Sequence, residues 1–509
     1  MGLDSALSIA SGGLANINAQ FALLSQNVAN AATPGYAVEV SSQQALTADG
    51  IGLGVHTGPA TLQIDQALQT SVLQQNATVT GLQTTQTSLQ AIDSVLGTPG
   101  SGNDIGSLLG NLQNSFSTLL TNPSSQPQQS AVVASATSLS QGINTLSAAY
   151  SAQRQAAQND LASTVNTLNS TLATIGQLSN QIIALKPTNQ STADLENQRN
   201  AAVQTLSQLL NVKSVEQPNG DLSLFTTNGL GLPTRAGSSQ FSLSNASTPA
   251  GSYYPGGGIP GIMLGGTDVT NQMGGGQIGA DITLRDTTLP TAQAGLDEFS
   301  QGLSSRFAAQ GLTLFTDPTG NVPAAGGTPA QAGYVGYAGT IQVNPAVTAD
   351  PSLVRDGTNA IAGSPTGAAA FTPNPTGGPA GFTTLISNIV NFTFGTQAQS
   401  GVTQPTMNTN GLGATGNLTA AFNAAGDALS NFATSLVSSQ AQHSATTTSN
   451  LTTEQALQTS LNAKVTAVSG VNMDTEMSQM LTLQNAYGAN ARVISAVQAM
   501  FTQLLQSVQ

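Results

Sequence analysis

The chain has 509 residues, of which only 6% are charged, and its formal net charge is −13 at pH 7. Ten Lys and Arg residues are too few for the basic patch with which a protein contacts nucleic-acid phosphates, so that class of partner is excluded. Cys is absent, which excludes disulfides, thiolate metal sites and cysteine nucleophiles. The length allows about two to four domains, each with its own core.

The first segment predicts a helix over residues 3–31. Its apolar residues follow one another at alternating steps of four and three, a spacing typical of helices that wind around a partner. These residues are Leu3, Leu7, Ala10, Leu14, Ile17, Phe21, Leu24, Val28 and Ala31. Ordering the backbone costs about 1 to 2 kcal/mol per residue, so we expect this helix to be ordered only when other helices cover it. Pro34 then stops the helix, and Gly35 can take a left-handed turn.

The middle of the chain predicts a helical stalk domain over residues 61–311. The helical spacing continues over 68–89, a long helix is expected from about 129 to 185, and another over 193–210. From about 211 to 283 the pattern changes to short alternating stretches with a Pro218-Asn219-Gly220 turn, which predicts a β excursion. Helix is expected again from 282 to 307.

Many of the Pro and Gly residues fall in 312–415, which we interpret as an outer β-rich insertion. The helical spacing then resumes over 416–463, as a return helix of the stalk. The first 60 residues are expected to form an axial helix and turn that pairs with a C-terminal axial helix over 464–509. The fold class is therefore mainly α with a β-rich insertion, elongated and multidomain, with paired terminal coiled-coil helices.

The C-terminal axial helix carries the same alternating spacing as the first segment. Its predicted seam comprises Met473, Met477, Met480, Gln484, Tyr487, Ala491, Ile494, Gln498, Phe501, Leu505 and Val508. Two terminal helices that each need a partner indicate a chain built for assembly. We therefore predict that the apolar residues of both seams form an assembly surface.

No constellation typical of an enzyme is found in the sequence. Glycine patterns of the nucleotide-binding kind occur three times, as chance allows among 54 glycines, and none sits between a clear strand and a helix. His56 and His443 have no metal-ligand spacing, and carboxylate pairs such as Asp297-Glu298 fall in expected helices, where a solvated face explains them. We expect no catalytic residues, no cofactor and no metal.

The sequence gives two expectations about compartment. No stretch reaches the roughly 18 continuous apolar residues that a membrane span needs, so we expect no membrane insertion. No Lys or Arg precedes Arg154, whereas a cleaved secretory signal needs a basic leader. If the protein is exported, we expect a route without signal-peptide cleavage.

Four stretches resemble bacterial flagellar axial proteins. The segment from Asn27 through Asn30, Thr33, Pro34 and Gly35 to Tyr36 is similar to the N-terminal signature of flagellar rod, hook and hook-associated proteins. Three others resemble the hook-associated protein 1 family, the hook-filament junction proteins. They are residues 194–200, residues 284–290 with Arg285, Asp286, Leu289 and Pro290, and residues 469–476.

This resemblance implies a structural protein that joins the flagellar hook to the filament, on the outside of the bacterial cell. It also implies the partners: further copies of itself in a ring, the hook protein, a second hook-associated junction protein, and an export chaperone of the type III apparatus at the C-terminus. A hook or distal rod protein is the nearest alternative, and the stretches at Asp194 and Arg285 disfavour it. A surface adhesin or a peptidoglycan hydrolase on an axial domain fits less well, because neither repeats nor a catalytic module are evident.

Overall fold

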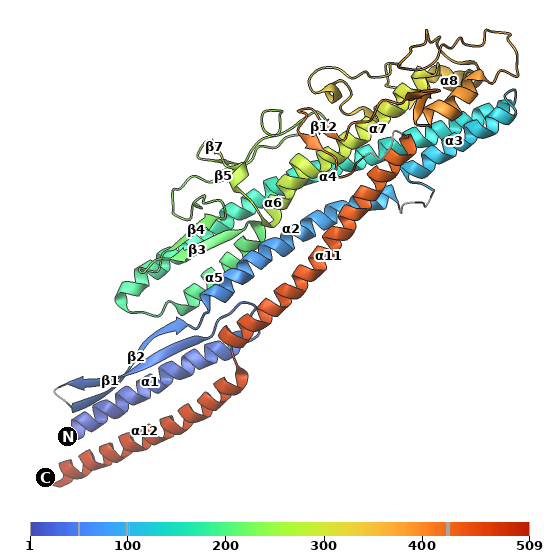
Figure 1. Cartoon of the computed structure of the whole chain (residues 1–509). Helices are drawn as coiled ribbons and strands as arrows, with labels where there is room; N and C mark the ends of the chain where they lie inside the picture. The colour runs from blue at the N-terminus through green and yellow to red at the C-terminus, as the bar shows by residue number, and fades with distance from the viewer. Residues whose placement is uncertain (1, 49–50, 98–99, 101, 424–427, 508–509) are drawn as a thin grey trace.

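The computed structural model describes residues 2–48, 51–97, 100, 102–423 and 428–507. The molecule is elongated and mainly helical, and both chain ends lie at the same tip (Figure 1). This confirms the predicted fold class. The expected loop at 98–102 falls largely outside the described residues, as does Val508. No helix in the described ranges is both long and apolar enough to span a lipid bilayer.

Long helices form the body. They are α2 (Gln66–Leu96), α3 (Ile105–Thr121), α4 (Gln126–Leu185), α5 (Ala193–Leu209), α7 (Leu289–Ala309) and α11 (Leu429–Ser469). The sequence explains several ends: the Asp65 carboxylate accepts from the backbone N–H groups at the start of α2, and Asp104 does the same for α3. At 60 residues, α4 is about 90 Å long at 1.5 Å per residue. It gives the molecule its length.

Two hydrophobic cores lie along α4. The first joins the first half of α4 to α3, α7, the start of α11 and the outer segment, around Phe116, Phe299 and Phe307. The second joins the later half of α4, through the predicted face that includes Leu161 and Ile175, to α5 and to the hairpin of β3 (Val212–Glu216) and β4 (Leu222–Thr226). Gly220 follows the turn that the sequence predicts and has a φ of +90°.

The helix expected from 282 starts six residues earlier, at α6 (Gly276–Thr283). It passes through η3 (Leu284–Thr288), a π-helical turn, into α7. Pro290 stands in the first turn of α7, where its missing N–H costs no hydrogen bond. Between β4 and α6 lie short strands β5 (Phe241–Ser242), β6 (Met263–Leu264) and β7 (Thr267–Asp268), which form one antiparallel sheet.

The segment 312–415 is a chain of loops with short elements, laid over one end of the body. Its strands have two or three residues each, and its helices four or five. The elements are β8 (Phe315–Thr316), β9 (Gln342–Val343), α8 (Pro345–Ala349), α9 (Leu353–Asp356), α10 (Thr384–Asn388), β10 (Gln397–Gln399), β11 (Val402–Thr403) and β12 (Asn410–Leu412), followed by β13 (Leu418–Thr419).

At the other end lies what we name the terminal layer: α1 (Leu3–Asn30), the antiparallel hairpin of β1 (Glu39–Ala48) and β2 (Ile51–Leu62), and α12 (Met473–Ser507). The chain turns sharply at Gly470 after α11, and α12 then runs antiparallel to α1 toward the shared tip (Figure 1). The terminal layer therefore extends beyond the body.

Candidate assembly surface

In the terminal layer, α1 packs against α12 and against the β1–β2 hairpin. Ala10, Ile17 and Leu24, every second member of the predicted N-terminal seam, are almost fully buried. Leu3, Leu7, Leu14, Phe21 and Val28 are half-buried, and Ala31 is exposed. Gly13 lets the helices approach closely, because a Cβ there would lie 3.3 Å from the Asn490 side chain.

The packed face of α12 differs from the predicted seam. Met480, Ile494 and Phe501 belong to both and are half-buried, but Leu483 and Val497 occupy packing positions in place of the neighbouring Gln484 and Gln498. Val497 is only 3% exposed. The difference has a chemical reason. The regular spacing placed Gln484 and Gln498 in the predicted seam, whereas the folded helix buries the residue before each of them, Leu483 and Val497, because apolar side chains gain more from burial.

Four of the remaining seam residues of α12 are large apolar residues that the described chain covers only in part. Eight large apolar side chains of this one helix are exposed: Met473, Met477, Leu481, Tyr487, Val493, Met500, Leu504 and Leu505. Leu505 is 68% exposed. Clustered exposed apolar residues mark interaction surfaces on soluble proteins. Four of the eight, Met473, Met477, Tyr487 and Leu505, are predicted seam residues that the contact with α1 does not bury.

The N-terminal signature holds the chain where it turns from α1 into the hairpin. Asn27 is buried, and its Nδ2 donates to the Glu39 carbonyl at 2.9 Å. Its Oδ1 accepts from the Glu39 N–H at 3.0 Å and from the Tyr36 hydroxyl at 3.2 Å. Gly35 supplies the turn with a φ of +78°, as the sequence predicts. The signature residues thus shape a backbone turn.

Two other signature stretches meet the first at this point. Asn197 in α5 exchanges two hydrogen bonds with the backbone of Ala37, and the Val38 N–H donates to the Ser469 carbonyl at 2.7 Å. Residues 27–36, 194–200 and 469–476 therefore converge on one junction between the terminal layer and the body. The other hydrogen bonds of the N-terminal signature are local: the Asn30 side chain donates to the Gln26 carbonyl, and the Thr33 hydroxyl donates to the Asn30 side chain.

The junction is acidic. Burial raises the pKa of Glu39 from its usual value, and the neighbouring Asp194 and Glu196 raise it further, while hydrogen bonds from Asn197 and Tyr36 oppose the rise. Burial and the charge of Glu39 also raise the pKa of the Tyr36 hydroxyl. The Tyr36 hydroxyl therefore stays protonated and keeps its hydrogen bond to the Asn27 Oδ1.

The fourth stretch, residues 284–290, lies in the body. Arg285 is fully buried: its guanidinium pairs with Asp286 at 2.7 Å and donates to Gln158 at 2.8 Å and to the Pro260 carbonyl at 3.2 Å. It also lies over the Tyr254 ring. Leu289 is buried in the first core. These residues fasten the loop before β6 to α4, which is a structural role.

Sequence reasoning missed Arg154. Its guanidinium donates to three backbone carbonyls, those of Arg285, Pro249 and Ser252, at 2.8 to 3.0 Å. Burial lowers the pKa of Arg154 to about 10, and Arg285 adds to this while Asp286 opposes it. The available signal was a single charged residue inside an otherwise uncharged helical face.

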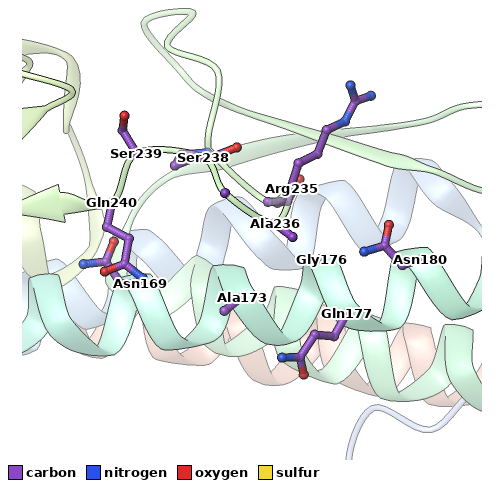
Figure 2. Close-up of a pocket in the computed structure, with 13 residues that line it drawn as sticks. Asn169, Ala173, Gly176, Gln177, Asn180, Arg235, Ala236, Ser238, Ser239 and Gln240 are labelled. Atoms are coloured by element: carbon purple, nitrogen blue, oxygen red, sulfur yellow. The ribbon is translucent and has the colours of Figure 1, made fainter.

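A hollow of about 160 Å³ lies where the loop 233–240 crosses α4 (Figure 2). Gly176 allows the crossing, because a Cβ there would overlap the Thr234 carbonyl. The lining is Asn169, Gln177, Asn180 and loop residues such as Arg235 and Ser238, without a carboxylate or an imidazole. The hollow therefore offers no acid–base group. Within the described ranges no three His, Asp or Glu side chains are grouped to hold a metal ion.

Two sequence families match this chain. Residues 89–321 match the family described as the flagellar hook-associated protein FlgK helical domain. Residues 465–507 match the flagellar basal body rod FlgEFG protein C-terminal family. The first match runs from the end of α2 to beyond α7, and the second covers the end of α11 and all of α12. No curated protein sequence matches the chain.

Among solved structures, the flagellar hook junction protein FlgK from Burkholderia pseudomallei is similar over part of its length. The identity is 26% and the TM-score 0.41. The match covers 50% of this chain and 45% of that one, so this chain spans less than half of the relative it matches.

Proposed function

We propose that this chain is a member of the hook-associated protein 1 family of flagellar axial proteins and a structural subunit that joins the flagellar hook to the filament. The terminal layer carries self-assembly, and the body and the segment 312–415 lie outside it. The proposal rests on one observation. The helix that matches the rod-protein C-terminal family, α12, has one face on α1 and leaves eight large apolar residues uncovered.

The energetics favour assembly. Fully burying a large apolar side chain contributes roughly 1.5 to 3 kcal/mol, so covering eight half-exposed ones across neighbouring copies is a substantial driving force. Only 6% of residues are charged, so few charged groups have to lose their water when copies pack together. Under this proposal the partners are further copies in a ring, the hook protein and a second hook-associated junction protein.

The same apolar face needs cover before assembly. An export chaperone of the flagellar type III apparatus that holds α12 would supply it, and the protein would leave the cell without signal-peptide cleavage. Recovery of the exported chain with its first residues intact supports this route, and an N-terminus near Ala31 contradicts it.

The proposed location is tested by gold-labelled antibody on isolated flagella. A single band at the hook–filament boundary supports the junction role. Label along the whole hook supports the alternative, a hook protein, and label below the hook supports a distal rod protein.

A further inference from the structure

A polar cavity of about 350 Å³ lies inside the terminal layer, between α1, β1 and the first turns of α12. Asn27, Glu39, Gln43, Glu476 and Gln479 contribute polar groups to its lining, and Leu24 and Leu483 contribute apolar ones. It is larger than a single ion needs and opens between the helices that we assign to assembly.

Two carboxylates line this cavity, and both residues are at least nine-tenths buried. Glu476 is 5% exposed and Glu39 is 3% exposed. The Glu39 carboxylate has Asn197 Nδ2 at 3.4 Å, whereas the Glu476 carboxylate accepts no hydrogen bond from any residue that the structure describes. The lining thus places two carboxylates at one cavity, and the Glu476 carboxylate has no donor from the described chain, which leaves it available to a cationic group.

The chain does not supply that cation to its own cavity. Residues 1–153 contain no Lys or Arg. Across the described ranges, the ion pairs are Lys186–Glu216, Arg199–Glu216, Arg235–Asp221, Arg285–Asp286 and Arg355–Asp356, and none involves Glu39 or Glu476. A metal ion fits poorly, because no three candidate ligands are grouped within those ranges.

One cation of the terminal layer is available for a contact with a neighbouring copy. Arg492 is the only Lys or Arg of α12, is exposed, and forms no ion pair within the described part of the chain. It follows Glu476 by 16 residues on a helix, which places the two about 24 Å apart along the axis. An Arg side chain cannot cover that distance within one copy. A neighbouring copy displaced along the helix axis can present its Arg492 there.

We propose that in the assembled state Arg492 of one copy enters the cavity of a neighbouring copy and pairs with its Glu476 and Glu39. The guanidinium offers five donors, enough for both carboxylates and the amide oxygens of the lining. The inference rests on the proposed assembly of the terminal layer. It also predicts the register between neighbouring copies, which would be displaced along the helix axis by the distance between Glu476 and Arg492. The pair would select that register, since apolar side chains alone tolerate sliding.

The test compares strains that carry only the variant protein, scored by the fraction of hooks that bear filaments. Glu476→Gln and Arg492→Gln should each lower this fraction about tenfold, and the double variant should be no worse than either. The exchanged pair Glu476→Arg with Arg492→Glu should recover to within about threefold of the parent. Lys464→Gln, an exposed lysine at the end of α11, removes the same charge and should have no effect.

Cysteine crosslinking covers the case in which Glu476→Arg fails to fold. The chain has no Cys, so Glu476→Cys with Arg492→Cys introduces the only two thiols. In assembled flagella a short thiol crosslinker should join successive copies into a ladder, while the free monomer gives none. Glu476→Cys with the exposed Gln498→Cys is the matched control and should give no ladder.

The outcomes separate the two proposals. Normal filaments on Arg492→Gln cells, or a ladder only with the control pair, would overturn the Arg492 contact. Loss of filaments on chelator treatment with Arg492→Gln unaffected would assign the cavity to a metal ion and also overturn it. In each case the junction role stands if Phe501→Asp still detaches filaments. If Phe501→Asp is normal as well, the assembly proposal itself fails.

Discussion

Asn197 and Ala37 form a closed amide pair across the junction between the body and the terminal layer. The Asn197 Oδ1 accepts from the Ala37 N–H at 2.9 Å, and its Nδ2 donates to the Ala37 carbonyl at 3.0 Å. The side chain in effect takes the place of a neighbouring strand at the residue before the hairpin. Both groups are buried, so water does not replace these bonds if Asn197 is lost.

Asn197→Ala should therefore loosen the terminal layer without unfolding the body. An unpaired buried backbone group costs about 1 to 3 kcal/mol, so the backbone N–H of Ala37 should exchange with solvent at least tenfold faster. Hydrogen exchange of residues 36–39 measures this directly. Asn180→Ala, at an exposed position of α4, is the control. Unchanged protection at Ala37 would show that the amide pair does not hold the junction.

Asp281 should lower stability at neutral pH. Burial raises the pKa of Asp281 to about 8, Asp160 adds to the rise and Arg285 opposes it, and its Oδ2 has no hydrogen-bond partner among the described residues. A raised folded-state pKa in a carboxyl group means that folding favours its proton, so stability falls as pH rises from about 4 toward 8.

Asp281→Asn cannot ionise, and we expect it to be more stable than the parent at pH 7.5 by up to about 5 kcal/mol, at 1.36 kcal/mol per pKa unit. The advantage should vanish near pH 3, where both forms are neutral. Urea unfolding at the two pH values provides the measurement. An advantage of equal size at both pH values would contradict ionisation as the cause.

Asp297 provides the opposite case. Burial raises its pKa to about 7, yet its carboxylate accepts from the Gly336 and Ala338 N–H groups and from Gln293. An Asn at this position turns an amide N–H₂ toward a backbone donor. Asp297→Asn should therefore destabilise the protein at pH 7.5 despite removing a buried charge, by about 1 to 3 kcal/mol. A stabilised Asp297→Asn variant would show that desolvation outweighs the hydrogen bonds.

Arg154 should control the loop that carries Pro249 and Ser252. Lys has one ammonium group and cannot reproduce the fork that reaches three carbonyls, so Arg154→Lys should free this loop. Limited proteolysis should then cut within residues 249–258 at least tenfold faster. Arg235→Lys, at a side chain that is 80% exposed, serves as the control and should leave cleavage unchanged. Equal cleavage of both variants would contradict the assigned role.

The spacing of apolar residues was sufficient to predict the long helices, because a stripe such as Leu161 to Ile182 must face a core wherever the helix lies. It could not place the face of α12. The packed face depends on the contact with α1 and on whether an apolar or a polar residue stands at each position. Regular three-four spacing takes neither into account. The π-helical turn at Leu284–Thr288 was missed. The role of the buried Arg154 was missed because its three partners lie 95 or more positions away along the chain.

The signature stretches were recognised as sequences, but their roles required the structure. Asn27 and Asn197 act through backbone groups of Glu39 and Ala37, which no residue pattern reveals. The functional assignment of the exposed face on α12 remains a prediction from exposure and apolarity.

Charges in the seams of the terminal layer should separate assembly from folding. Ile17 is a buried residue of α1, with only 6% of its surface exposed. An Asp at this position buries a charge without a partner, at a cost of several kcal/mol. Because the body has two cores of its own, Ile17→Asp should shift its melting temperature by less than about 2 °C. The same charge at the exposed Asn18, as Asn18→Asp, is the matched control.

The most direct test counts filaments on the hooks of cells that carry only Phe501→Asp, beside a melting curve of the purified variant. Phe501 is half-buried on the packed face of α12 and lies far from both cores of the body. We predict bare hooks and a melting transition close to that of the parent. Normal filaments on Phe501→Asp cells would contradict the claim that the terminal layer is the assembly surface.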